Sequence, residues 1–257
     1  MLLAATLVAG SAGLSCASHP LPPAMAAALV EPPPDEQASE AVAGLSVTAE
    51  QKKAIDALRT KLHEDLAGAT KARDELVKVL LASLTLGRVD HAQVDPAVRA
   101  LVAATDEAKP AVLAALDTLH ALLNPEQRAK LVERLDQRKG ESEGESKRRL
   151  KQIVQALDLG VSQQIEIASA AKAHFANEKD EVAKLKDQIK AAVTAFKADS
   201  FHASELQLAR APLAEHWLGV AISLLEVVVP VLDEEQRLAL VAIARKMMGG
   251  AADRRPH

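Results

Sequence analysis

The sequence predicts an all-α protein, and three observations predict it. Hydrophobic residues make up 49% of the 257 residues, but aromatic residues make up only 2% and there is no Tyr. Strands favour aromatic and β-branched residues, whereas the long tracts of Ala, Leu, Lys, Glu, Gln and Arg favour helices. Apolar residues also recur at helical spacing, and several stretches begin with a polar residue followed three positions later by Gln, which is a helix-start signal.

The first 16 residues resemble an export signal. Residues 1–15 carry no charge and are mostly apolar, too few to span a bilayer, and small residues follow them. The run GLSC (13–16) resembles a bacterial lipobox, in which Cys16 becomes the lipidated N-terminus. A cut after Ala17 would discard Cys16 instead, and an apolar N-terminal helix of a cytosolic protein is a further interpretation. We expect an exported periplasmic protein, anchored to the membrane through a lipid on Cys16.

Residues 17–44 are rich in Pro and Ala, and they contain four acids but no base. Proline removes hydrogen-bond donors and favours extended backbone, so we expect a disordered tether rather than a folded element. From Lys52 onward, the net charge of the chain is close to zero. No basic field of the kind that nucleic-acid binding needs is present, so we expect no nucleic-acid partner.

Residues 45–138 are expected to form a first helical unit. Thr48 and Gln51 have the spacing of a capping box, in which the hydroxyl and the amide satisfy backbone N–H groups at the helix start. A heptad-like apolar stripe then predicts one long helix ending near Leu86–Gly87. Its members are Ile55, Leu58, Leu62, Leu66, Ala69, Ala72, Leu76 and Val79.

A second long helix is expected to begin between His91 and Pro96, with Asp95 as the cap and Pro96 at the first helical position. It should run to about Leu122, with a kink at Pro110. The next residues, LNPEQ (123–127), combine a cap at Asn124 with a Pro at the first position and a Gln at the third.

The charged, Gly- and Ser-containing residues 139–149 indicate a solvated linker or a frayed helix end. Residues 150–248 are expected to form a second unit and 249–257 a loose tail. In the second unit GVSQQ (160–164) places Gln164 where Gln51 lies. GVSQQ lacks both the Leu and the Thr of the motif, so Ser162 could serve as the cap, or the helix could run on from residues 146–158.

The stretches LNPEQRAKL (123–131) and LDEEQRLAL (232–240) repeat Leu, Glu, Gln, Arg and Leu at one spacing. Each unit therefore opens and closes with the same kind of helix start, which indicates a tandem duplication of a unit of roughly a hundred residues. We interpret the polar members as structural capping residues rather than a binding set. The motif residues are Thr48, Gln51, Leu123, Asn124, Gln127, Gln164, Leu232, Asp233 and Gln236.

Two ordered pairs of variants of Leu-Thr-x-x-Gln in an exported helical protein resemble the Spy/CpxP (LTXXQ-motif) family of periplasmic stress chaperones, to which ZraP- and CnrX-type proteins are related. The resemblance covers about residues 45–247. It implies units of long antiparallel helices, ATP-independent chaperone or stress-modulating activity, and a curved antiparallel dimer in the family. With two units in one chain, a pseudo-dimer within a monomer is the corresponding expectation.

The residues themselves indicate no enzyme and no cofactor. The single Cys lies in the export segment, and the chain has no Gly-rich phosphate loop, nucleophile elbow or Cys cluster. The histidines are scattered, although His91 and His202 occupy matched places in the two units. A metal site needs two to four converging ligands, so surface or helix-end histidines are the expected interpretation, with metal sensing as an alternative.

The expected function is to hold unfolded or misfolded envelope proteins on shallow apolar patches of amphipathic helices, without ATP. Self-association is a further expected contact, and the lipid on Cys16 supplies the membrane contact. Two alternatives remain open at this point. One is a structural or interaction module in which all apolar stripes are core, and the other is a metal-responsive periplasmic sensor.

Overall fold

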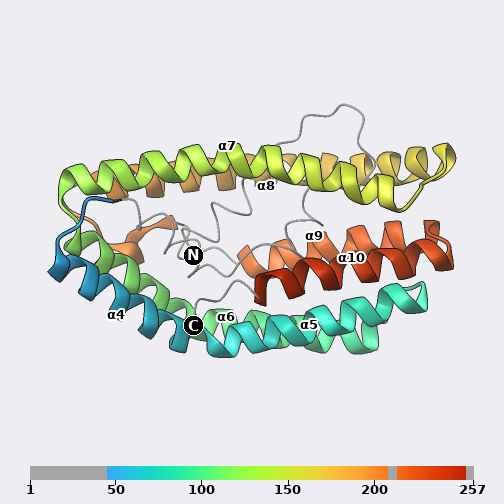
Figure 1. Ribbon diagram of the computed structural model, residues 1–257, viewed down its shortest axis with the longest axis horizontal. Coiled ribbons are helices and arrows are strands. Elements are labelled where there is room, and N and C mark those ends of the chain that lie inside the picture. The colour runs from blue at the N-terminus through green and yellow to red at the C-terminus, as the bar shows by residue number, and fades with distance from the viewer. Residues whose placement is uncertain (1–44, 208–212, 253–257) are drawn as a thin grey trace.

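The computed structural model describes residues 45–207 and 213–252 (Figure 1). The predicted signal (1–16) and tether (17–44) lie outside the described residues. Every regular element within these ranges is helical, so the all-α prediction is confirmed. In chain order these elements are α4 (Ala49–Asp65), α5 (Ala67–Leu86), α6 (His91–Leu122), α7 (Pro125–Ala156), α8 (Val161–Lys197), the 3₁₀ turn η1 (Ala203–Glu205), α9 (Leu213–Val228), the 3₁₀ turn η3 (Val229–Val231) and α10 (Glu234–Ala252).

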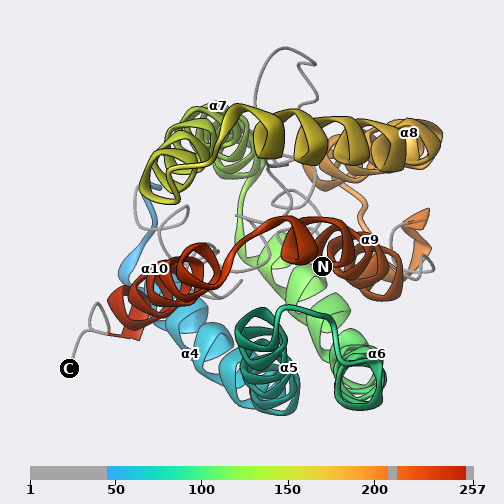
Figure 2. The same cartoon turned by 90° about the vertical axis from the view of Figure 1, so that its right-hand side faces the viewer.

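The helices lie in pairs that stack in layers. Viewed from one end, α7 and α8 form the upper layer, α9 and α10 the middle layer, and α5 and α6 the lower layer (Figure 2). With the long axis of the molecule horizontal, α9 and α10 are seen to occupy only one half of its length (Figure 1). In the other half α4 packs against the second part of α6, so this part of the first unit has fewer helical neighbours.

The first predicted helix is two helices in the structure. Thr48 caps α4, with the reciprocal hydrogen bonds of a capping box to Gln51. The chain then breaks helical regularity for one residue at Leu66, two positions before Gly68, and resumes as α5. Gly87 ends α5 in the left-handed conformation, with φ of 73°. Glycine adopts this conformation without steric cost, which explains why the helix ends there.

The cap predicted for the second helix is wrong. The N-cap of α6 is Asp90, whose carboxylate accepts from the N–H of Ala92 at 3.2 Å, and not Asp95. Pro96 therefore lies inside α6. The helix starts earlier because the left-handed turn at Gly87 ends α5 and because the N–H of Asp90 donates to the Ser83 hydroxyl at 3.3 Å. That contact fixes Asp90 in the extended conformation of a cap residue.

The linker predicted at residues 139–149 is also wrong, because α7 runs through these residues as part of one 32-residue helix. Glu, Lys and Arg, which make up much of this stretch, are strong helix formers. These preferences outweigh the cost of two glycines, each about 1 kcal/mol relative to Ala. The predicted loose tail is likewise partly helical, since α10 extends to Ala252.

Two hydrophobic cores hold the layers together, and each combines residues from both halves of the chain. The first core joins the end of α5 and the start of α6 to the start of α8, α9 and α10. The second core joins the end of α6 and the start of α7 to the end of α8 and the residues around η1. Each half therefore packs the tip of its long hairpin against the closing motif of the other half.

Candidate binding surface

The opening and closing motifs of the first unit meet through their glutamines. The Nε2 of Gln51 donates to the Oε1 of Gln127 at 2.9 Å, and the Nε2 of Gln127 donates back to the Oε1 of Gln51 at 3.0 Å. The second amide hydrogen of Gln51 goes to the Leu122 carbonyl at 2.7 Å, and that of Gln127 to the Ser46 carbonyl at 2.7 Å. We call this reciprocal pair the first clasp.

Both amides of the first clasp are saturated. The Oε1 of Gln51 also accepts from the N–H of Thr48 at 3.0 Å, and the Oε1 of Gln127 from the N–H of Asn124 at 3.0 Å. A side-chain amide has two N–H donors and an oxygen with two lone pairs, so no hydrogen-bonding position of either amide remains for a ligand. The first clasp is thus a structural joint between the start of α4 and the start of α7.

A second clasp joins the starts of α8 and α10, and it corrects one predicted residue. The partner of Gln236 is Gln163, not Gln164: the two amides exchange hydrogen bonds of 2.8 and 3.0 Å. The N-cap of α8 is Gly160, one position before the predicted register, and the N–H of Gly160 donates to Gln163 at 3.0 Å. Gln164 instead donates to the Leu159 carbonyl at 2.7 Å.

The remaining motif residues occupy matching places in the two clasps. Asn124 and Asp233 accept from the N–H of Gln127 and Gln236 at 2.9 and 2.8 Å. The leucines before them are buried, each with only 2% of its surface exposed. These leucines are Leu123 and Leu232.

The arginine that follows each closing glutamine was not predicted as a motif residue, although it recurs in both sequences. Arg128 and Arg237 each donate through Nη1 to the carbonyl five positions earlier, that of Leu123 at 3.1 Å and that of Leu232 at 2.6 Å. Arg128 is buried and also reaches Asp199 at the tip of the second hairpin, at 2.9 Å. Each arginine thus lies where one half meets the hairpin tip of the other.

A buried histidine fixes the tip of the second hairpin. The Nε2 of His120 lies 2.8 Å from the Ala198 carbonyl, so this nitrogen carries the hydrogen. The imidazole ring stacks on Phe201 and meets the edge of Phe196, with ring centres 5.0 and 5.4 Å away. His120 is therefore a core residue that joins α6 to the loop after α8, and it is not exposed as a ligand.

The tip of the first hairpin is fixed by a different histidine. The two ring nitrogens of His91 lie 2.9 Å from a carboxylate oxygen of Asp95 and 2.6 Å from one of Glu226, so His91 joins α6 to α9. Hydrogen bonds to Asp95 first, and then to Glu226, raise the pKa of His91 above its ordinary value of about 6.5. The imidazolium form can donate to both carboxylates at once.

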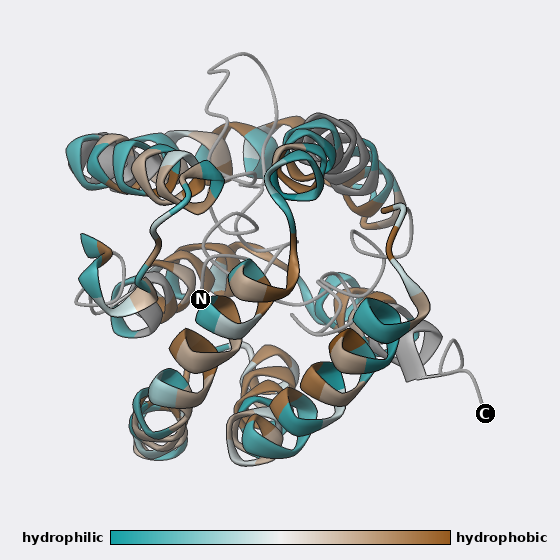
Figure 3. Ribbon diagram, turned by 90° about the vertical axis from the view of Figure 1, so that its left-hand side faces the viewer, coloured by the Kyte–Doolittle hydropathy of each residue, from teal (hydrophilic) through white to brown (hydrophobic). Residues whose placement is uncertain are grey.

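The middle of the first unit presents apolar side chains that belong to neither core. α4 contains no buried residue at all, although it carries part of the predicted apolar stripe. Hydrophobic and hydrophilic residues alternate along the helices at this end of the molecule (Figure 3). Five of the half-buried aliphatic residues outside both cores are here called the mid-unit surface: Leu58, Leu62, Leu66, Val102 and Val112.

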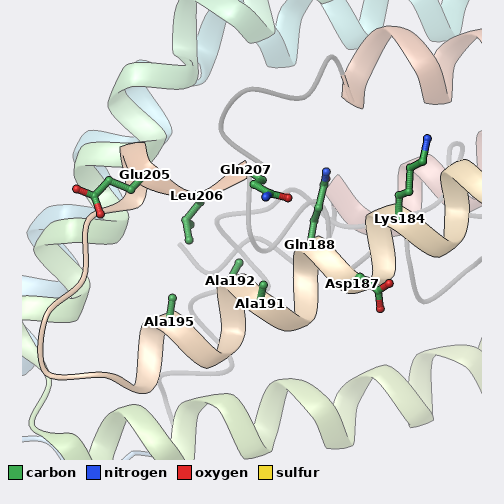
Figure 4. A pocket seen from close by; sticks show the side chains of 9 residues that line it. All are labelled: Lys184, Asp187, Gln188, Ala191, Ala192, Ala195, Glu205, Leu206 and Gln207. Carbon is green, nitrogen blue, oxygen red and sulfur yellow. The ribbon is translucent and has the colours of Figure 1, made fainter.

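A cavity of about 620 Å³ lies between α8 and the residues after η1 (Figure 4). Ala191, Ala192 and Ala195 of α8 form its floor, and Leu206 points toward them from the opposite side. Lys184 and Glu205 are among the charged residues at its rim.

Among the residues that the structure describes, no group of three or more His, Cys, Asp or Glu side chains is placed to hold a metal ion. Over the same residues, no helix combines the length and the hydrophobicity that crossing a membrane requires. The matched positions of His91 and His202 have different roles, since His202 is exposed and precedes η1.

Comparisons with known proteins agree with the motif geometry. Searches among curated proteins and among solved structures gave no match. The family model described as "LTXXQ motif family protein" matches residues 35–135, which contain the whole first clasp. Proteins of this family are typically periplasmic and related to stress, and it is not a family of enzymes. Residues 35–135 of this chain therefore match the LTXXQ motif family, the Spy/CpxP type.

Proposed function

We propose that this protein is an ATP-independent periplasmic chaperone that binds unfolded or misfolded envelope proteins on the mid-unit surface. The observation that carries the proposal is the position of that surface. Leu58, Leu62 and Val112 are half-buried, lie between the two cores and pack into neither of them. Apolar residues that are not needed for a core remain available for a weakly bound client.

The charges around the mid-unit surface fit this function. Lys61 and Asp65 form an exposed pair at 2.8 Å beside the apolar stripe of α4, and Arg59 and Glu64 are also exposed. Charges of both signs keep the surface soluble and give unfolded segments polar contacts at its rim, without selecting one client sequence. A shallow surface of this kind releases clients by simple dissociation, so no nucleotide is required.

Suppression of aggregation tests the proposal directly. The full-length chain is mixed without nucleotide with a chemically denatured test protein at ratios from substoichiometric to equimolar, and light scattering is followed after dilution. We expect scattering to fall with increasing chain. Equimolar chain with no effect on scattering would rule the proposal out and leave the structural or interaction module as the better interpretation.

Matched variants locate the activity. Leu58→Glu with Leu62→Glu places two charges on the mid-unit surface and should weaken suppression several-fold. Leu86→Glu places the same kind of charge on a leucine that is 60% exposed at the hairpin tip, and it should leave suppression unchanged. Circular dichroism and thermal melts of all variants establish that they are folded. Equal loss in both variants would show that the activity does not depend on this surface.

We also propose that a lipid on Cys16 anchors the protein to the membrane. The lipobox-like residues 13–16 support this anchor, and the Pro- and Ala-rich residues that follow would give the helical part reach from the bilayer. A mass spectrum of the protein from the membrane fraction tests it. A diacylated N-terminal Cys16 is the expected species, and a free Ser18 N-terminus would contradict the anchor.

A further inference from the structure

The large hydrophobic side chains that are exposed in the described part of the chain gather at one end of the molecule. They are Leu86, Val161, Ile165 and Leu238, with exposed fractions of 60, 74, 61 and 49%. The second clasp joins the start of α8 to the start of α10, and Gly87, at the end of α5, lies beside the Arg237 guanidinium of α10. Figure 2 looks onto this end, where α5 ends and α8 and α10 begin. We call these four residues the apolar end.

The matched positions of the repeat carry no large hydrophobic residue. Positions can be matched by their distance from the helix caps, since both clasps begin their helices in the same way. The counterparts of Leu86, Val161, Ile165 and Leu238 are, in that order, Lys197, Ala49, Lys53 and Ala129, and all four are exposed. The first clasp therefore forms with Ala and Lys at these places, so folding does not require the apolar end. Single exposed hydrophobic residues are ordinary, whereas a set confined to one of two matched ends indicates contact with another molecule.

The charges beside the apolar end are mainly negative. Exposed carboxylates that form no ion pair within the described ranges flank it on α8 and α10: Asp158, Glu166, Glu234 and Glu235. The base in the same stretches is Arg237, which is half-buried and donates to the Leu232 carbonyl. Arg88, two residues after Leu86, is exposed and does not balance the four acids. Such a surface repels an anionic bilayer or the same acidic end of a second copy, and it attracts a partner with Lys or Arg beside its apolar residues.

We propose that the apolar end binds an amphipathic segment of a partner protein, in which Lys or Arg residues flank an apolar face. The apolar face covers Val161, Ile165 and Leu238, and the bases of the segment pair with the four free carboxylates. The mid-unit surface is built from other residues, so this is a second interaction surface. The inference does not rest on chaperone activity, and its test requires no denatured client.

Titration of a labelled peptide with the full-length chain tests the proposal by fluorescence anisotropy. The probe is a short helical peptide of Leu and Lys, with leucines at positions i, i+3, i+4 and i+7. Val161→Ala with Ile165→Lys gives α8 the two residues that α4 carries at the matched positions, so the fold should tolerate both changes. Thr194→Lys, at an exposed residue near the other end of α8, is the control for the added charge. We expect Kd to rise about tenfold or more in the double variant and to stay unchanged in the control.

A second pair of substitutions tests the charges. Asp158→Asn with Glu166→Gln should raise Kd several-fold and weaken its dependence on salt, because exposed charges are screened by ions. A peptide with Glu in place of Lys should bind the unchanged chain at least several-fold more weakly. Circular dichroism and thermal melts establish that each variant is folded.

Equal Kd values for the unchanged chain and for Val161→Ala with Ile165→Lys would overturn the proposal, and so would equal Kd values for the Lys and Glu peptides. Binding to anionic vesicles, or a dimer, that the same double variant abolishes would assign the apolar end to a membrane or to a second copy and contradict the partner segment. Suppression of aggregation should be unchanged in this double variant, so the failure of one proposal is distinguishable from the failure of the other.

Discussion

Replacing Gln127 by alanine is expected to weaken the fold strongly, although Gln127 is an uncharged polar residue. Its amide makes four hydrogen bonds that all lie at the joint between α4 and α7. The Gln127 side chain is buried, with 7% of the residue exposed. The substitution leaves the Ser46 carbonyl, the Asn124 N–H and the Gln51 amide without these partners.

The expected magnitude follows from these bonds. A hydrogen bond contributes about 0.5–1.5 kcal/mol to stability, and water can reach some of the groups that Gln127→Ala leaves behind. We therefore expect a loss of about 2–3 kcal/mol in the free energy of unfolding. For a chain of this size a loss of 1 kcal/mol lowers Tm by about 2–4 °C, so Tm should fall by about 5–10 °C.

Urea denaturation of a double-mutant cycle measures this effect. Gln51→Ala and Gln127→Ala are made singly and together, and Gln152→Ala, an exposed glutamine of α7, is the control. Because the two amides bond to each other, the double variant should lose about 1–2 kcal/mol less than the sum of the single losses. Additive losses, or a loss from Gln127→Ala no larger than that from the control, would refute the clasp as a stabilising joint.

Three further predictions test separate joints. Gly160→Ser supplies the hydroxyl that the α8 cap lacks and should stabilise by about 0.5–1 kcal/mol in urea melts. Gly87→Ala should lower the free energy of unfolding by about 1–2 kcal/mol, since φ is 73° and the new Cβ would lie 3.0 Å from the Arg237 guanidinium. Gly219→Ala is the control: open space surrounds Gly219, so the substitution should not destabilise the protein. The contribution of His91 to stability is fully present below its unfolded pKa of about 6.5, and it is lost as pH rises through its raised folded pKa. NMR titration with His91→Asn as the control checks this.

Much of the fold could be predicted because helix starts are encoded locally. Thr48, Asn124 and Asp233 each carry an oxygen that can accept from a backbone N–H, and a glutamine follows each at the third position. This chemistry acts within one helical turn, so it is readable without knowledge of tertiary structure. The structure has a hydrogen-bonded cap at each of the three positions.

The register of the second unit could not be read in the same way. Gly160 has no side chain to identify it as a cap, and the two adjacent glutamines, Gln163 and Gln164, offered two registers. Only the tertiary partner, Gln236, distinguishes them. The linker prediction for residues 139–149 is wrong for another reason: Gly and Ser indicate a linker, but the helix-forming preference of the charged residues around them is stronger.

The repeated arginines were the signal that sequence reasoning missed. Gln127–Arg128 and Gln236–Arg237 recur together, but an arginine on a helix is usually a solvated residue, so its burial depends on contacts from the other half of the chain. The mid-unit surface was beyond prediction for the same reason. The stripe from Leu58 to Leu76 is uniform in sequence, but only the structure separates Leu76 in the first core from Leu58 outside both.

Hydrogen exchange of the chain with and without a bound unfolded client tests the central claim most directly, because it maps contact without altering a residue. We predict slower exchange in the parts of α4 and α6 that carry the mid-unit surface, residues 55–66 and 101–113, and unchanged exchange at the turn of residues 86–90. Slower exchange confined to other helices, or no change on adding a client that the chain holds in solution, would contradict it.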